Sequence, residues 1–366
     1  MSKVNSFYEK VIGSKINLTP MELKDLWRED IAAMTEQEFN LHRERLFQFS
    51  IPIFEKMNQR LGDKHIGIHQ FYEGLPDMTQ TVGADDMPAL QELYAQFCFW
   101  RAGCKIYDIH PNLANRFKIT SLRAVPIELL RLPFDTIKLL IPAGLLKCNL
   151  SNAPEKEMFA REITTTIADS TLIKGKKEMM IFYQFKSDIG YFRIQLSQPE
   201  VLRCVEHTFD ILLAGDRPSW VEGKPVELTA QDRQALKAMF EFTLKSILYI
   251  TGADADVEWW DERSALEGQL RRAKSGGKAK EIARRLERAK ALYKVGHRIV
   301  LSREEKMMHE NINKGLWHVG HRFIVQGHWR HQAHGPHHSE RKLIFIEPHY
   351  KGPAFTELIN NPHLVK

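Results

Sequence analysis

Residues 178–196 read EMMIFYQFKSDIGYFRIQL, and this stretch decides the fold class. It holds two runs rich in aromatic and branched apolar residues, 178–185 and 191–196, a composition that strands favour. Between them, residues 186–190 carry Ser, Asp and Gly, which are common turn residues. The pattern predicts two antiparallel strands joined by a short turn.

Further strands and helices are expected on both sides of this hairpin. Apolar residues between Pro133 and Pro142 predict a buried strand within 134–149, and residues 163–167 predict another. Apolar residues at helical spacing predict helices over 35–61, as one helix or a pair bent at Pro52, and over 87–102, 201–213 and 229–251. The chain is therefore expected to be α+β, with helices packed on one antiparallel sheet.

The helical pattern continues beyond the body but is interrupted once. Residues 274–278, KSGGK, separate a helical pattern over 262–273 from a second over 279–294. The second pattern places many lysines and arginines around a narrow apolar face. We therefore predict a basic helical hairpin.

The C-terminal part has strand periodicity instead. Residues 323–325 and 343–345 alternate apolar and polar positions around a loop that carries Gly335-Pro336, which predicts a small β-hairpin. The expected parts of the chain are an N-terminal helical region (1–85), an α+β body (86–260), a basic helical hairpin (261–296) and a His- and Arg-rich β module (297–366).

The composition is that of an ordinary globular protein. The 366 residues are 43% hydrophobic and 27% charged, which excludes a mainly disordered chain. The longest apolar run, 139–146, is far shorter than the ~20 residues of a membrane helix, and the first residues lack a signal-peptide core. Four well-separated cysteines indicate reduced thiols rather than a disulfide framework. We expect a soluble cytoplasmic protein.

The charge is unevenly distributed along the chain. The formal net charge is +6, but residues 271–366 hold 20 Lys and Arg against 8 Asp and Glu, so the first 270 residues are net acidic. Ten of the 16 histidines lie between His297 and His349. A basic segment on an acidic body is typical of nucleic-acid binding, although a solvated basic face without a ligand is the plain alternative.

RNA fits this segment better than duplex DNA does. Cationic side chains neutralise phosphates, and Trp or His rings stack on bases that are unpaired, as RNA bases often are. The candidate RNA-binding residues are Arg284, Arg285, Arg288, Arg298, Arg322, His328, Arg330, His331, Arg341 and Lys342.

The tryptophans at positions 259, 260 and 329 allow predictions about individual side chains. Trp329 and Arg330 adjoin on one strand, so their side chains should point to opposite faces. We expect Trp329 to fill a small core and Arg330 to contact RNA; the alternative is an exposed Trp329 that stacks on a base. Trp259 and Trp260 cannot both face one core in regular structure, so at least one should lie at an interface, between domains or with a partner.

The histidine cluster leaves other functions open. His328, His331, His334, His337 and His338 could bind a transition metal, yet no cysteine and few carboxylates lie nearby. Two imidazoles could serve as base and acid of a ribonuclease if they converge on one phosphate. No common nucleotide-binding, hydrolase or zinc-protease motif occurs. We expect a protein that acts by binding, with no catalytic residues, no cofactor and no metal.

The C-terminal module resembles a known family. The segments that carry the resemblance are Gln326–Arg330 (QGHWR), Arg341–Pro348 (RKLIFIEP) and Lys351–Pro353 (KGP). Weaker similarity upstream covers Phe99–Arg101, Ile106-Tyr107, Leu132–Phe134, Met180–Phe185, Leu248–Ile250 and Val295–Arg298. The family occurs in phages, plasmids and bacteria, and it includes a type V-A anti-CRISPR that suppresses production of the effector nuclease.

The resemblance implies a function coupled to protein synthesis. The family member recognises the emerging N-terminal peptide of its target, a CRISPR effector nuclease, and causes loss of the messenger. By this resemblance the acidic body would recognise the peptide, and the basic module would face RNA or the ribosome. A histidine-dependent ribonuclease and a phage structural or assembly protein are the alternatives. The longer region 1–85 and the histidine-rich loop depart from the family's pattern.

Overall fold

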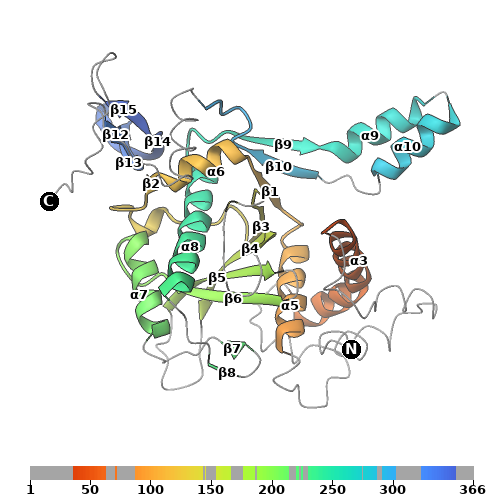
Figure 1. Ribbon diagram of the computed structural model, residues 1–366, viewed down its shortest axis with the longest axis horizontal. Coiled ribbons are helices and arrows are strands. Elements are labelled where there is room, and N and C mark those ends of the chain that lie inside the picture. The colour runs from red at the N-terminus through yellow and green to blue at the C-terminus, as the bar shows by residue number, and fades with distance from the viewer. Residues whose placement is uncertain are drawn as a thin grey trace.

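The computed structural model describes residues 36–62, 71, 87–142, 145, 154–165, 176–185, 188–213, 220–221, 224–225, 230–273, 275–286, 291–301 and 323–351 (Figure 1). Helices and strands alternate through these ranges, so the chain has the expected α+β class.

A seven-stranded sheet forms the centre of the molecule. Its order is β6 (Asp188–Gln195), β5 (Lys176–Phe185), β4 (Pro154–Thr165), β3 (Thr136–Leu140), β1 (Ile106–Ile109), β10 (Ala291–Val295) and β9 (Val257–Asp261). The hairpin predicted from residues 178–196 is confirmed as β5 and β6, which pair antiparallel from Glu178↔Gln195 to Phe185↔Asp188. The strand expected at 163–167 lies mostly earlier in the chain, as β4.

The sheet is mixed, so the expectation of a purely antiparallel sheet is wrong. Strand β1 pairs in parallel with β3 on one side and with β10 on the other. Parallel neighbours need a crossover connection, and helix α6 (Pro111–Lys118) supplies it between β1 and β3. The strands beyond this centre pair antiparallel, β3 with β4 and β10 with β9.

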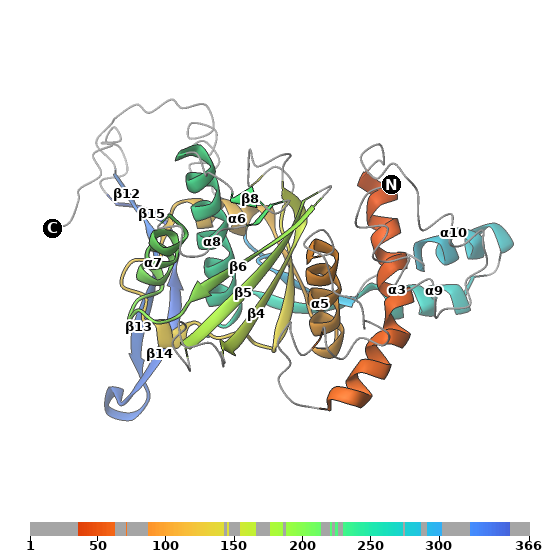
Figure 2. The same ribbon diagram turned by 90° about the horizontal axis from the view of Figure 1, so that it is seen from below.

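Helices cover both faces of the sheet (Figure 2). Helix α5 (Met87–Arg101) lies on one face with α3 (Glu36–Leu61) outside it, and α6, α7 (Val201–Leu213) and α8 (Ala230–Ile250) lie on the other. The long helices were predicted to within a few residues; α6 was not. Helix α3 runs unbroken through Pro52 and ends at Gly62, whose φ is +65°.

The main core lies between the sheet and the α7–α8 layer. Helix α8 contributes its predicted apolar stripe, which is fully or almost fully buried: Leu236, Met239, Phe240, Leu244, Ile247 and Leu248. On the other face, aromatic rings join α3 to α5, and Phe54 lies 5.6 Å from Phe97 between ring centroids. Among the described residues, no helix has the length and apolar character to cross a membrane.

A helical arm connects the two strands at one end of the sheet. Strand β9 leads into α9 (Glu262–Arg271), then α10 (Gly276–Leu286), and the chain returns as β10. Figure 1 shows the arm extending away from the sheet. The helix expected over 279–294 is therefore too long: Ala291–Val295 is a strand, because Tyr293 pairs with Tyr107 on one side and Trp259 on the other.

The C-terminal strands form a hairpin that docks on the body. Strand β13 (Gly327–His334) pairs with β14 (Glu340–Ile346) around the short helix η5 (Pro336–His338), and also with β2 (Thr120–Ser121). Residues 323–325 were expected in this hairpin, but they form β12 (Phe323–Val325), which pairs with β15 (His349–Lys351). The remaining short elements are η4 (Ile127–Leu129), β7 (Trp220–Val221) and β8 (Lys224–Pro225).

Candidate functional site

The β13–β14 hairpin carries much of the predicted RNA-binding set. Arg330, His331 and Arg341 are exposed, and Lys342 is half-buried. The strand register directs Arg330 and Lys342 to one side of the hairpin and His331 and Arg341 to the other. The Nζ of Lys342 lies 3.7 Å from an Oδ of Asp254. Figure 2 shows the hairpin tip projecting from the body, so both of its sides present cations.

The inner side of the hairpin holds Trp329. This ring is 7% exposed, between Phe345, 5.2 Å away, and Phe117 of α6, 6.4 Å away by ring centroids. Phe345 in turn contacts Tyr249 of α8 at 5.6 Å. The expected opposition of a buried Trp329 and an exposed Arg330 is confirmed. The core that Trp329 fills is the joint between hairpin and body.

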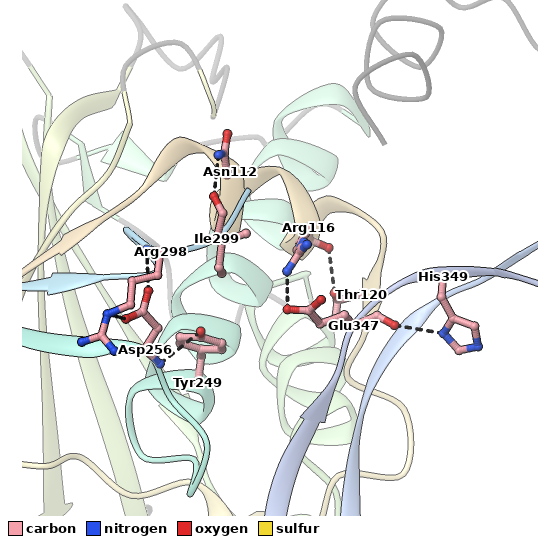
Figure 3. Close-up of polar contacts among 9 residues, drawn as sticks. All are labelled: Asn112, Arg116, Thr120, Tyr249, Asp256, Arg298, Ile299, Glu347 and His349. Atoms are coloured by element: carbon pink, nitrogen blue, oxygen red, sulfur yellow. Dashed lines mark hydrogen bonds and ion pairs between the residues drawn. The ribbon is translucent and has the colours of Figure 1, made fainter. Parts of the chain in front are cut away.

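Polar contacts fix the orientation of this joint (Figure 3). The buried Arg116 of α6 forms an ion pair with Glu347, which directly follows β14. The Thr120 hydroxyl donates to the Arg116 carbonyl at 2.7 Å, and the Gly327 amide donates to the Ile119 carbonyl at 3.1 Å. The hairpin is therefore held on α6 by its backbone as well as by its side chains.

The other predicted cations lie elsewhere. Arg284 and Arg285 are exposed in the last turn of α10, where Arg285 lies 3.5 Å from Glu262 of α9. Figures 1 and 2 both place this arm on the opposite side of the molecule from the hairpin. Arg288 and Arg322 lie outside the described residues. The structure thus places Arg284 and Arg285 far from the predicted cations of the hairpin.

Arg298 has a structural contact that the sequence did not predict. Its amide donates to an Oδ of Asp256 at 2.7 Å, and its guanidinium lies 3.2 Å from the other Oδ (Figure 3). The guanidinium also lies 3.7 Å from Glu258. The Gly296 amide donates to the Asp256 carbonyl at 2.8 Å, and the Asn112 amide group donates to the Ile299 carbonyl at 2.8 Å. Arg298 therefore helps to fix residues 296–299 against the body.

The histidines of the hairpin do not converge on one point. A ring nitrogen of His328 lies 3.2 Å from the Gln326 carbonyl, at the base of β13. His334 pairs with Glu340 at 3.2 Å, and His337 and His338 are exposed. Within the ranges the structure describes, no group of three or more His, Cys, Asp or Glu residues is arranged to hold a metal ion.

Trp259 and Trp260 lie on β9, the edge strand of the central sheet. Their exposed fractions are 51% and 42%, and they point to opposite faces. Trp259 contacts Tyr293 edge to face at 4.8 Å, and the Lys294 ammonium lies 3.5 Å from the centre of the Trp260 ring. Among the described strands, none pairs with the outer side of β9. An edge with exposed rings on both faces suits an extended partner chain.

Sequence reasoning missed a polar cluster where β1 and β10 end. Asp108 lies near the end of β1, His110 caps α6, and His297 follows β10. An Oδ of Asp108 is 3.4 Å from Nε2 of His297, and the two imidazole rings are 4.9 Å apart by centroids. Burial and then the neighbouring His297 lower the pKa of His110, against the opposing effect of Asp108 and Asp256. One sequence signal could have indicated this cluster. A proline at position 111, directly after an alternating apolar run, is typical of a helix that begins just after a strand, and His110 lies at that junction.

Comparison with known proteins identifies the family. The sequence profile of the AcrVA2-like family, anti-CRISPR type V subtype A2, matches residues 107–350, which is more than half of the chain. A crystal structure of AcrVA2 is similar at a TM-score of 0.48 and 12% sequence identity, over 86% of this chain and 99% of that chain. No curated protein matches the chain. The match spans both strands of the polar cluster, the arm and the hairpin, and by it this chain belongs to the AcrVA2-like family of type V anti-CRISPR proteins.

Proposed function

We propose that this anti-CRISPR protein suppresses production of a CRISPR effector nuclease, binding RNA with its C-terminal hairpin and the emerging nuclease peptide with the edge of its sheet. The observation that carries the proposal is the two-sided hairpin. Trp329 fixes its inner side to α6, while Arg330, His331 and Arg341 project from its free part.

Exposed cations on a rigid support favour RNA binding. Arg330 and Arg341 are both exposed, so a phosphate can reach either guanidinium. Strand pairing and the joint on α6 hold the backbone that carries them, which reduces the entropy lost on binding. Arg284 on the arm adds a separate cation at the opposite side, where a long or folded RNA could reach both groups.

The edge strand β9 supports peptide binding. An extended peptide would add its backbone to the outer side of β9, and Trp259 and Trp260 would contact its side chains on alternate faces. Glu258 on the same strand is 52% exposed and its oxygen lies 3.7 Å from Arg298, so the edge carries charge as well as apolar surface. A newly made N-terminus is extended and unfolded, which is the conformation this edge accepts.

The test follows the nuclease and its messenger in bacteria. Cells that make a type V-A effector nuclease together with this protein should lose both the nuclease protein, seen by immunoblot, and its messenger, seen by quantitative RT-PCR. The double variant Arg330→Ala/Arg341→Ala should restore both. The matched control is Arg203→Ala on α7, which removes an exposed arginine that pairs locally with Glu206 at 3.1 Å. Inhibition of DNA cutting with unchanged nuclease and messenger levels would refute the proposal.

A further inference from the structure

The polar cluster of Asp108, His110 and His297 lies where active sites of sheet proteins commonly form. Strands β1 and β10 are adjacent and parallel, with Asp108 paired to Lys294 and Ile109 to Val295. Their carboxyl ends therefore meet at one edge of the sheet, and the loops that follow bring His110 and His297 together. The side chains of His297 and Asp108 are 29% and 38% exposed, so a ligand can reach them.

The loop that carries His297 is held in one conformation. Asp256 accepts from the amide of Gly296. It also accepts from the amide of Arg298, and the Asn112 side chain donates to the carbonyl of Ile299 (Figure 3). Gly296 has φ +72°, and a Cβ there would lie 2.7 Å from Leu113 of α6. Only glycine permits this close approach. The local structure thus places His297 against His110 before any ligand arrives.

Neighbouring polar groups determine which nitrogen of each imidazole carries the proton. Nδ1 of His110 accepts from the Asn112 amide at 3.2 Å, so the neutral ring carries its proton on Nε2, where it can be donated. Nε2 of His297 lies 3.4 Å from an Oδ of Asp108, and a carboxylate at this distance favours the tautomer with the proton on Nε2 and a lone pair on Nδ1. The cluster therefore contains an aspartate-oriented base beside a neutral N–H donor.

We propose that these residues form a metal-independent site that cleaves RNA by transesterification, an activity beyond the binding role above that rests on the RNA binding proposed there. His297 Nδ1 takes the proton of a ribose 2′-hydroxyl, and the 2′ oxygen bonds to the adjacent phosphorus. The bond from phosphorus to the next 5′ oxygen breaks, and water protonates that oxygen. His297 then returns its proton to water, leaving a 2′,3′-cyclic phosphate and a 5′-hydroxyl.

The other residues have distinct roles in this step. His110 donates from Nε2 to a non-bridging phosphate oxygen as charge builds on it. Asp108 is a positioning residue, because it acts on His297 rather than on RNA. Four further charged residues lie around the cluster. The carboxylates of Asp256 and Glu258 form ion pairs with Arg298, and the ammonium group of Lys294 lies over the Trp260 ring.

The experiment uses the purified full chain and an end-labelled RNA oligonucleotide in excess EDTA. We expect cleavage that yields 2′,3′-cyclic phosphate ends and no cleavage of the same sequence made with 2′-deoxy or 2′-O-methyl riboses. His297→Ala should lower the rate by about 10²-fold or more. Asp108→Asn should lower it and shift its pH profile, and Asp108→Glu should recover part of the rate. The control His207→Ala, on α7, should leave the rate unchanged.

Binding is measured on the same proteins by fluorescence anisotropy, so that two failures can be told apart. RNA that binds but stays intact in EDTA overturns the cleavage site and leaves the proposed function standing. RNA that does not bind at all overturns both. Cleavage that EDTA abolishes, or that His297→Ala leaves unchanged, also overturns the site. Circular dichroism checks that each variant is folded. If His297→Ala unfolds, the cleavage rate and pH profile of the near-isosteric Asp108→Asn variant test the proposal instead.

Discussion

Arg116 of α6 and Glu347 after β14 form an ion pair although 231 positions separate them in the sequence. The arginine side chain is 7% exposed and the glutamate side chain 52%, so the pair lies at the boundary between the body and the C-terminal hairpin. It joins the part of the chain that carries the sheet to the part that carries the exposed cations.

Removing one member of this pair should loosen the joint. Glu347→Ala should lower the free energy of unfolding by about 1–2 kcal/mol, because a buried guanidinium loses a charged partner that is itself half exposed. Urea denaturation measures the change. Glu340→Ala removes an exposed glutamate that pairs with His334 in the same hairpin, and it should stay within about 0.5 kcal/mol of wild type. Equal effects of the two changes would contradict the role given to Arg116.

Substitutions at Trp329 and Arg330 should have different effects, the first on stability and the second on RNA affinity. Trp329→Ala should cost about 3–5 kcal/mol of stability, because it leaves a cavity between Phe117 and Phe345. Arg330→Ala should preserve stability, weaken RNA binding and reduce the salt dependence by about one phosphate contact. Thermal melts and RNA titrations at two salt concentrations check both variants. A fully stable Trp329→Ala protein would show that the ring does not stabilise the joint between hairpin and body.

Gly327 should tolerate no side chain. A Cβ at this position would lie 2.6 Å from the Thr120 hydroxyl oxygen and 2.9 Å from Pro348, so Gly327→Ala should push β13 away from β2 and cost about 1–3 kcal/mol. The matched control is Gly277→Ala in α10, where nothing lies within 4 Å of the added carbon. Gly277 is exposed in the first turn of α10, so this change should alter the stability by less than about 0.5 kcal/mol. The order of the two melting temperatures tests the prediction.

Substitution of an exposed tryptophan on β9 should weaken peptide binding and leave the protein folded. Trp259→Ala should weaken binding of a nuclease N-terminal peptide by about 2 kcal/mol, since exposed tryptophans at interfaces are frequent hot spots. Isothermal titration with the synthetic peptide measures the affinity. Val300→Ala removes an apolar side chain that is 79% exposed and lies outside β9, and it should leave the affinity unchanged. A peptide that binds both variants equally well would place the partner elsewhere.

His110 should make the protein sensitive to acid. Its pKa in the folded state is lowered, first by burial and then by His297, so the unfolded chain binds a proton more readily. The stability that this residue contributes is present above the ordinary histidine pKa of about 6.5 and is lost as the pH falls from that value through the lower pKa of the folded state. His110→Asn keeps a good helix cap and removes this titration. Its urea midpoint should fall less than that of wild type between about pH 7 and pH 5; an equal fall would assign the sensitivity to other histidines.

The sequence predicted the elements whose pattern is local. Helices α7 and α8 have long apolar stripes, and β5 and β6 are joined by a turn of ordinary composition. Strand β10 was mistaken for helix because its apolar residues continue the helical spacing of α10. What makes it a strand is the stacking of Tyr293 on Tyr107, 4.7 Å apart by centroids, and this contact is not visible in either segment alone.

The candidate site was predictable only in part, for a similar reason. Arg330 and Arg341 are exposed as their alternation with apolar residues suggested. Arg298 looked equivalent, yet its carboxylate partner Asp256 lies 42 positions earlier. Asp108 lies on β1 and His297 follows β10, and these strands are far apart in the sequence. Only the pairing of β1 with β10 therefore reveals the two residues as neighbours.

The place of β10 in the sheet also sets the order in which the protein can be completed during its own synthesis. Strand β1 has β10 as its neighbour on one side, and β10 is made only when the ribosome has passed residue 295. Until then β1 is an open sheet edge, the kind of surface that pairs with other chains. A product released before that point, such as a fragment ending near Gly252, would expose this edge and should aggregate rather than act as a smaller functional unit.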